Sequence, residues 1–515
     1  MTNSALVIGA GHNGLVCAIY LAKAGYQVQV LEANQAVGGA AASYEFAEGY
    51  RAPGLANVPY GLNSKICKDL KLRPRVQRAK SALDTISLSA QGEHLTLTDN
   101  QVLGAGICDR DAQAYTAFKA EFKRYAKALQ PLMINRPPRL KDMDRNDKFT
   151  LAKLGWSLRF GLGAKSMREF LRVGGINIYD VLNEIFDSEQ LKAAIAVDAV
   201  LGQHMGPRTP NTVLTYLQRL WAETQASQQL VSGSDTLETL KAAAVSAGVS
   251  IRLNAKVKRI EVDQGAAVAV QLESGEQISA PLIVSNADAK TTFLNLVGTR
   301  DLDAMFCHRI DNHRCQGNVA KVFLGVKGLP TFTGLDPQQL SQRLLIAPDL
   351  RYIEHGFNPV KYAEHAQHPV LEITIPSTVD SALAPSAYHV VSVSAAYAPY
   401  THKLGWESQR DLFMQAVLST LERYAPGFAE TVVVSKLLTP ADIEQQFNTQ
   451  GGHWHHGELS IDQSFMMRPV HGAAQYDTPI KGLYLCGAGT HPGGGITGVP
   501  GHNAAQRILE TGGHK

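Results

Sequence analysis

Gly9-Ala10-Gly11-His12-Asn13-Gly14 is the stretch that decides the fold of this chain. It follows a short apolar run, residues 5–8, and precedes residues 15–24, which carry the apolar periodicity of a helix. We therefore expect a buried parallel strand, a tight turn and a helix. In this arrangement Gly9 permits the turn, Gly11 leaves room for a phosphate group, and Gly14 lets the helix pack closely on the strand.

An acidic residue follows at the distance that nucleotide binding requires. The second apolar run, residues 27–31, ends in Glu32. In dinucleotide-binding folds an acid at this place accepts a hydrogen bond from the ribose 2′-hydroxyl, which predicts an unphosphorylated adenosine ribose. His12 and Asn13 lie in the phosphate turn, at the N-terminus of the expected helix. NAD and FAD both fit this first unit.

Two later features favour FAD. Gly38 and Gly39, six residues beyond the acid, match the segment with which large flavoproteins approach the pyrophosphate a second time. Near the C-terminus an apolar run leads into a glycine-rich loop and then into an expected helix that begins near Pro500 and ends at Gly512. The N-terminus of that helix would stabilise the anionic reduced flavin. The loop supplies further candidate cofactor residues: Gly487, Gly489, Thr490, Gly495, Ile496, Thr497, Gly498 and Val499.

Four stretches carry a resemblance to a known family: Gly-His-Asn-Gly-Leu at 11–15, Ser-Asn-Ala-Asp at 285–288, Gly-Glu-Leu-Ser at 457–460 and Gly-Ala-Gly-Thr-His-Pro-Gly-Gly-Gly at 487–495. Over essentially its full length the chain resembles the phytoene desaturase-related flavoproteins, in the branch named for a pyridine nucleotide-disulphide oxidoreductase domain. The resemblance implies a two-domain flavoprotein with one non-covalent FAD, related more distantly to monoamine oxidase. It also implies that Val257 contacts the adenine end through its backbone and that Asn286 belongs to the cofactor site.

Three departures distinguish the chain from its wider relatives. Ala40 stands where amine oxidases usually carry an arginine near the phosphates, and Ala488 stands where many flavoproteins carry an acid that binds the ribityl chain. Both changes fit the desaturase-like branch, and Ala40 remains in the predicted cofactor site. Residues 232–235, Ser-Gly-Ser-Asp, replace the Gly-Gly-Met-Gly expected of that branch.

Length and composition predict two interleaved domains. With 515 residues and 45% hydrophobic residues, the chain exceeds a single core. We expect an α/β protein with a Rossmann-like FAD-binding domain of the kind found in glutathione reductase and amine oxidases, and an α+β substrate domain. The FAD-binding domain would take residues 1–65, 230–298 and 451–515, and the substrate domain residues 66–229 and 299–450.

Candidate catalytic residues lie in one short stretch, Gly-Gly-His-Trp-His-His-Gly-Glu at 451–458. Alternation with period two would place His453 and His455 on one face of an extended segment. A base with a pKa near neutral can accept the proton that accompanies hydride loss, which makes His453, His455, His456 and Glu458 the candidates. His456 and Glu458 also fit a purely structural role, and no ligand set for a metal is complete.

These features predict an FAD-dependent oxidoreductase. The leading hypothesis is a dehydrogenase or desaturase that removes hydride from a C–C or C–N bond of a largely apolar small molecule, with O2 or a quinone as electron acceptor. One alternative is an FAD-dependent amine oxidase that produces peroxide. Another is a flavin-bearing interaction protein with little turnover.

Charge and hydropathy indicate the compartment and the partners. A net charge of +3 is too small to favour nucleic acid, the first strand begins by Ala5 without a leader, and six scattered cysteines suit a reducing compartment, so we expect a cytoplasmic protein. Between Arg136 and Arg172 ten Lys or Arg accompany four Asp or Glu, interleaved with apolar residues. This segment is either a solvated face of ordinary helices or a peripheral membrane contact.

Overall fold

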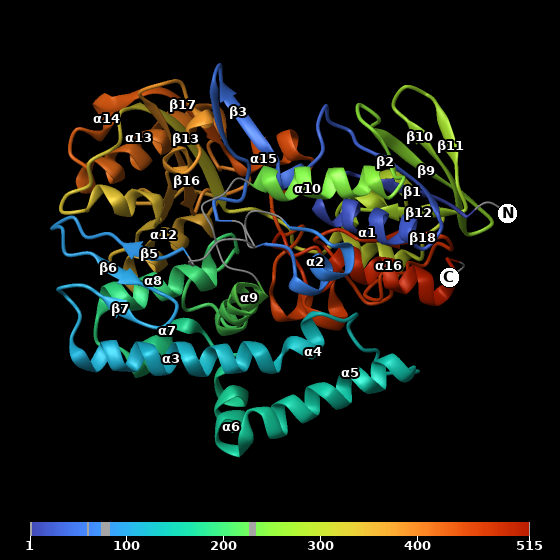
Figure 1. The fold of residues 1–515 in the computed structure, drawn as a ribbon, viewed down its shortest axis with the longest axis horizontal. Coiled ribbons are helices and arrows are strands. Elements are labelled where there is room, and N and C mark those ends of the chain that lie inside the picture. The colour runs from blue at the N-terminus through green and yellow to red at the C-terminus, as the bar shows by residue number, and fades with distance from the viewer. Residues whose placement is uncertain (1–2, 59–60, 74–82, 226–232, 514–515) are drawn as a thin grey trace.

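The computed structural model describes residues 3–58, 61–73, 83–225 and 233–513. Its first layer is a parallel five-stranded sheet in the order β18-β12-β1-β2-β8 (Figure 1). β1 (Ser4–Ile8) and β2 (Gln27–Leu31) pair along their whole length, as the two apolar runs predict. The other strands come from distant parts of the chain: β8 (Ser250–Arg252), β12 (Leu282–Ser285) and β18 (Leu483–Leu485). The sheet is therefore assembled from N-terminal, middle and C-terminal segments.

β1 separates two apolar layers because successive side chains of a strand point to opposite faces. Ala5 and Val7 pack with helices α1 (His12–Lys23) and α16 (Val499–Thr511). Leu6 and Ile8 pack on the other side, in the core of a small antiparallel sheet. Its strands are β9 (Val257–Asp263), β10 (Ala266–Leu272) and β11 (Gln277–Ser279). The Rossmann-like fold predicted from the sequence is confirmed.

A second, eight-stranded sheet has the order β17-β13-β16-β15-β14-β5-β6-β7, and the β14–β5 pair is its parallel one. The strands that concern the site are its central ones. The bounds are β5 (Thr85–Ser87), β6 (Leu95–Leu97), β7 (Val102–Leu103), β13 (Val319–Lys327), β14 (Arg343–Ile346), β15 (Leu371–Thr374), β16 (Tyr388–Ala396) and β17 (Val432–Leu438).

The two faces of this second sheet differ in polarity. Val322 and its neighbours pack against α13 (Trp406–Tyr424) in an apolar core. On the opposite face, Lys321, Ser394 and Glu372 stand directly beside one another on β13, β16 and β15. All three side chains are buried, so a polar row crosses the middle of the protein.

Helices cover the polar side of the second sheet (Figure 1). Contacts link α8 to β5 of that sheet and to α7, α9 and α12, and α9 to α3. A helical hairpin, α5 followed by a π-helical turn and α6, projects at the lower edge of the view. The bounds are α3 (Asp109–Ala128), α5 (Arg145–Trp156), the π turn (Ser157–Gly161), α6 (Gly163–Val173), α7 (Ile178–Ile185), α8 (Glu189–Val200), α9 (Thr212–Gln225) and α12 (Leu350–Val360).

Shorter elements complete the fold. They are β3 (Ser43–Ala47), β4 (Tyr50–Pro53), α2 (Ser64–Leu70), α4 (Gln130–Met133), α10 (Gly233–Ser246), α11 (Ala304–Asp311), α14 (Phe428–Thr431) and α15 (Pro440–Phe447). The division into two interleaved domains stays a prediction. Its border at residues 229 and 230, and Ser232 of the substituted motif, lie outside the described residues.

Candidate active site

The first turn of α1 provides a cradle that only glycine can form. Gly9 follows β1 with φ of +94°, and its N–H donates to the carbonyl of Leu31 at 2.8 Å. A Cβ on Gly14 would lie 2.2 Å from the carbonyl oxygen of Gly9, and one on Gly11 would lie 2.8 Å from Nδ2 of Asn286. The helix N-terminus therefore reaches the edge of the sheet with its N–H groups exposed to an approaching anion.

Glu32 is fixed at the end of β2 by two backbone donors. Its Oε2 accepts from the N–H of Ala10 at 2.7 Å, and its Oε1 accepts from the N–H of Asn34 at 2.9 Å. The side chain is buried beside the glycine turn. A carboxylate held in this way retains lone pairs that can accept from ribose hydroxyl groups.

A cavity of about 180 Å³ runs from Glu32 along the glycine turn. Its lining includes Glu32, Val257 of β9, Trp454 and His456. The predicted cofactor residues that line it are Gly9, Gly11, His12, Asn13, Glu32, Gly38, Gly39, Ala40, Val257 and Asn286. Gly14 lies in the first turn of α1, against the carbonyl of Gly9, where it sets the distance between helix and strand.

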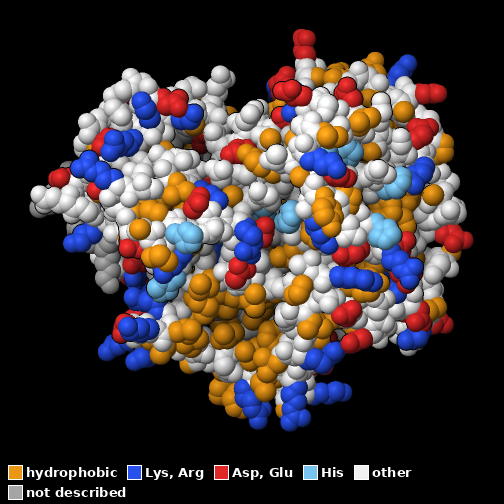
Figure 2. Space-filling model, turned by 180° about the vertical axis from the view of Figure 1, so that it is seen from behind, with side chains coloured by type: hydrophobic (Ala, Val, Ile, Leu, Met, Phe, Trp, Pro, Cys, Tyr) orange, Lys and Arg blue, Asp and Glu red, His pale blue; other side chains and the backbone are white. Residues whose placement is uncertain are grey.

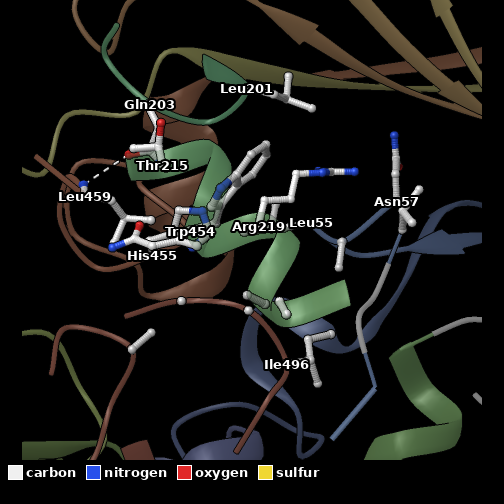
Figure 3. Close-up of a pocket in the computed structure, with 18 of the residues that line it drawn as sticks. Leu55, Asn57, Leu201, Gln203, Thr215, Arg219, Trp454, His455, Leu459 and Ile496 are labelled. Atoms are coloured by element: carbon white, nitrogen blue, oxygen red, sulfur yellow. Dashed lines mark hydrogen bonds between the residues drawn. The ribbon is translucent and has the colours of Figure 1, made fainter. Parts of the chain in front are cut away.

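A second cavity of about 200 Å³ adjoins the first, and Figure 3 shows residues that line it. The two share His12, Ala40, Trp454 and Ala488 in their linings. Gly495 and Ile496 of the predicted C-terminal loop line the second cavity. The remaining loop residues support these walls without lining either cavity: Gly487, Gly489, Thr490, Thr497, Gly498 and Val499. Gly498 caps α16, so the loop ends at a helix N-terminus.

The histidine stretch forms a turn, which corrects the prediction of an extended segment. Gly451 and Gly452 have φ of +67° and +66°, and His456 has φ of +55°. The N–H of His456 donates to the carbonyl of His453 at 2.8 Å, which closes the turn. Alternation along the sequence therefore does not decide which side chains share a face. His455 lines the second cavity, His456 lines the first, and His453 lines neither.

Burial keeps these imidazoles neutral. It lowers the pKa of His455 to about 3, and it lowers the pKa of His453 and of His456 below the ordinary value. The positive charge of Arg468 acts in the same direction on all three. These side chains can accept hydrogen bonds at neutral pH but hold a proton weakly.

Glu458, the fourth catalytic candidate, points away from both cavities. Its Oε2 pairs with Nε of Arg314 at 2.9 Å, and its own N–H donates to the carbonyl of Arg314 at 3.0 Å. It lines neither cavity. This placement supports the structural alternative for Glu458.

Arg468, which no sequence pattern singled out, organises the loops around the site. Its side chain is fully buried, and burial lowers its pKa to about 9. Within the part of the chain that the structure describes, the guanidinium donates only to backbone carbonyls. The acceptors are His455, Gly457, Glu458, Gln463 and Ala488, at 2.6 to 3.3 Å. A single side chain thereby fixes the histidine turn to the start of the C-terminal glycine loop.

The residues present fit FAD. The glycine cradle would accept a pyrophosphate, and Glu32 would accept the hydroxyl groups of an adenosine ribose. Nε2 of His12 and Oδ1 of Asn13 are buried and make no hydrogen bond within the described part of the chain, so both can bond to a cofactor. The two adjoining cavities, which share four lining residues, suit an elongated dinucleotide.

Comparisons with known proteins show the family of the chain. The profile of the family described as "Flavin containing amine oxidoreductase" matches residues 14–509. Pyridine nucleotide-disulfide oxidoreductase domain-containing protein 2 of Mus musculus is 33% identical, with 98% of this chain and 93% of that protein covered. A limonene dehydrogenase component from Castellaniella defragrans is 27% identical over 98% and 94% of the two chains. The neurosporene-forming phytoene desaturase of Cereibacter sphaeroides is 26% identical over 96% and 92%.

Solved structures share the fold at lower identity. An oxidoreductase from Methanosarcina mazei superposes with a TM-score of 0.61 at 16% identity, covering 98% of this chain and all of that one. Cyclohexylamine oxidase from Brevibacterium oxydans gives 0.56 at 16% identity, covering 99% of both chains. The resemblance to phytoene desaturase-related flavoproteins is confirmed. The chain belongs to the flavin-containing amine oxidoreductase family and is an FAD-dependent oxidoreductase.

Proposed function

We propose that this protein is a dehydrogenase or desaturase that removes hydride from a C–C or C–N bond of a largely apolar small molecule. The observation that carries the proposal is the apolar part of the second cavity. Its apolar lining includes Leu55, Leu201, Trp454, Leu459 and Ile496. Bound FAD supplies the hydride acceptor. The side chains would hold an apolar substrate there and exclude water.

The neutral histidines suit this chemistry. Dehydrogenation releases a proton together with the hydride, and His455 lies in the cavity wall. Because burial lowers its pKa to about 3, His455 would accept a hydrogen bond and pass a proton on without storing it. The names of two relatives, limonene dehydrogenase and phytoene desaturase, support removal of hydrogen from apolar compounds.

Two acidic residues in the cavity wall are the observation that would support an amine oxidase. Asp198 and Glu372 line the second cavity, and an acid there could receive an ammonium group. However, Arg343 pairs with Asp198 at 2.8 Å and with Glu372 at 2.7 Å. Arg219 also lies 3.0 Å from Asp198, so two arginines balance the two acids, which favours the dehydrogenase hypothesis.

Anaerobic reduction of the bound flavin would test the proposal. We expect apolar alkenes or cyclic terpenoids to bleach the flavin absorbance, and amines of similar size to leave it unchanged. Reoxidation by O2, with peroxide as product, or by a soluble quinone would then identify the acceptor. Bleaching by amines alone would make the protein an amine oxidase. FAD binding without bleaching by either panel would favour an interaction protein with little turnover.

We also propose that the hairpin of α5, the π turn and α6 contacts a membrane surface in the cytoplasm. Phe149, Trp156, Phe160 and Leu171 are each at least 59% exposed. The rings of Trp156 and Phe160 lie 4.4 Å apart. Seen from behind, apolar side chains gather toward the lower edge of the molecule, with Lys and Arg below them (Figure 2). Exposed aromatic groups beside cations are typical of helices that lie on anionic membranes.

Two observations concern the kind of membrane association and the compartment. Among the helices that the structure describes, none is both long and apolar enough to cross a bilayer. All six cysteines lie outside disulfides, which supports a reducing compartment. A peripheral contact through the hairpin would place an apolar substrate close to the protein.

A further inference from the structure

One wall of the second cavity is charged. It is contributed by the second sheet and by helices α8 and α9, and it contrasts with the apolar wall beside the glycine loop. Asp198, Arg219 and Glu372 line it together with Asn57. Figure 3 shows Arg219 and Asn57 at this wall. An enclosed charged wall is costly unless its groups are paired, so its charge balance constrains what the cavity can receive.

The charged side chains form one connected network. Arg343 is fully buried and bridges Asp198 and Glu372. Arg219 Nε lies 3.0 Å from Asp198 and 3.6 Å from Glu223. The latter carboxylate lies 3.5 Å from Nζ of Lys119. Asp198, Arg219 and Glu372 are the members of this network that line the cavity. Arg219 and Asp198 keep 15% and 16% of their side chains exposed.

Lys321 adds a cation behind this wall. Its side chain is fully buried, and Nζ donates to Oδ1 of Asn57 and to Oγ of Ser394, the latter at 3.2 Å. Within the described residues Lys321 has no ion pair with an acid. Asn57 lines the cavity and separates Lys321 from it. Lys321 is thus one side chain away from any molecule that fills the cavity.

The count of charges shows an excess of cations. Within this network the described cations are Arg219, Arg343, Lys119 and Lys321, and the described acids are Asp198, Glu223 and Glu372. Burial lowers the pKa of Lys321 to about 7, so below that pH four positive charges face three negative ones, and above it the charges are equal in number. With Lys321 protonated, one negative charge delivered to the cavity would balance the network, whereas an ammonium group would add a fifth positive charge.

We propose that the substrate carries a carboxylate on its apolar body and that Arg219 and Asn57 receive this group. The inference rests on the proposed function and names the substrate class for the same cavity. The apolar wall of Leu201, Trp454 and Ile496 would hold the hydrocarbon part. Arg219 provides the charge-assisted donors that a carboxylate prefers, and the amide of Asn57 lies at the same wall.

Binding to the FAD-loaded full chain tests the inference without requiring turnover. Decanoate, decanol and decylamine share one chain length and differ in the head group. Their dissociation constants can be measured by calorimetry and by perturbation of the flavin absorbance. We expect decanoate to bind about ten-fold tighter than decanol, and decylamine to bind more weakly than either.

Two variants locate the effect. Arg219→Gln should remove the preference for decanoate while leaving the affinity for decanol unchanged. Asn57→Asp places an acid beside Lys321 and should likewise remove the preference for decanoate. The new ion pair with Lys321 would offset the hydrogen bonds that the substitution removes. Arg110→Gln is the matched control because this exposed arginine pairs with Asp187 at the surface. The control should keep the preference of the native chain.

The outcomes separate this inference from the proposed function. Tighter binding of decylamine than of decanoate would overturn it, as would a preference for decanoate that both variants retain. Preferential binding of decanoate without any flavin bleaching by apolar compounds would refute the dehydrogenase proposal but leave the carboxylate site supported. Bleaching by neutral apolar compounds without selectivity for decanoate would support the dehydrogenase proposal and refute the carboxylate site.

Discussion

Nη2 of Arg468 donates a hydrogen bond of 3.0 Å to the carbonyl oxygen of Ala488. The same nitrogen donates at 2.6 Å to the carbonyl of His455, which lies in the histidine turn. One nitrogen thus joins the two loops that meet where the cavities merge. No acid pairs with this guanidinium within the described residues, so backbone carbonyls alone solvate its charge.

Arg468→Met is expected to destabilise the protein and to weaken FAD retention. The substitution leaves several buried carbonyl oxygens without donors, and each costs about 1–3 kcal/mol. We expect a loss of at least about 3 kcal/mol in the free energy of unfolding, with a smaller loss for Arg468→Lys. Urea unfolding and flavin release on gel filtration would measure both effects.

A surface variant provides the control for this prediction. Arg110→Met removes an exposed ion pair and should change stability by no more than about 1 kcal/mol. Equal stability of Arg468→Met and Arg110→Met would show that the buried guanidinium does not hold the loops. Loss of stability with unchanged flavin retention would confine its role to folding.

Gly14→Ala should yield a protein without flavin. The new Cβ would lie 2.2 Å from the carbonyl oxygen of Gly9, so α1 would have to move away from the phosphate cradle. Gly155→Ala makes the same change in α5, where a Cβ has open space, and should retain FAD. The absorbance of the purified proteins would report loading. A fully yellow Gly14→Ala protein would contradict the assignment of this turn.

The cradle could be predicted because its residues are local in sequence. Glycine spacing, the apolar run and Glu32 lie within about one βαβ unit, and its geometry is shared by many nucleotide-binding folds. The charged wall could not be predicted in this way. Asn57, Arg219 and Lys321 come from a loop, a helix and a strand that only the tertiary fold brings together.

The histidine turn shows a different limit. The alternation of His453 and His455 is compatible with a strand, but the preceding Gly451 and Gly452 adopt positive φ and the chain turns instead. Two adjacent glycines are a turn signal that outweighs a short alternating pattern. The role of Arg468 could not be predicted, because the sequence does not distinguish a buried arginine from an exposed one.

Lys321→Met should alter the pH dependence of stability. Burial lowers the pKa of Lys321 to about 7, against about 10.4 in the unfolded chain. Between these values the unfolded chain binds the proton that the folded chain has released. The free energy of unfolding of the native protein therefore rises with pH by up to about 1.4 kcal/mol per unit relative to the variant.

We expect the free energy of unfolding of the variant to exceed that of the native protein most below pH 7. This difference should shrink toward pH 10. Urea unfolding at a series of pH values would measure it, with buried histidines cancelling in the difference. Lys327→Met is the matched control, because this residue is exposed at the end of the same strand. A difference that stays constant with pH would show that Lys321 does not release its proton on folding.

The hairpin should bind anionic vesicles in a salt-sensitive manner. Arg159 lies beside the Trp156–Phe160 pair, its guanidinium 5.4 Å from the Phe160 ring, whereas Arg172 is paired with Glu169 and Glu184 and carries less available charge. A triple change of Arg159, Lys165 and Arg168 to Glu should abolish co-sedimentation with phosphatidylserine vesicles. Each cation contributes about 1 kcal/mol near such a surface, and salt screens this attraction.

A matched triple variant separates the hairpin from net charge. Changing Lys241, Lys327 and Lys436 to Glu produces the same total charge at surfaces away from the hairpin, and vesicle binding should persist. Trp156→Ser with Phe160→Ser keeps the charge and removes the apolar contact, so binding should become weak even at low salt. If both charge variants sediment equally, net charge alone would explain vesicle binding, and the hairpin would have no special role. Absence of sedimentation for the native chain would make the hairpin an ordinary solvated surface.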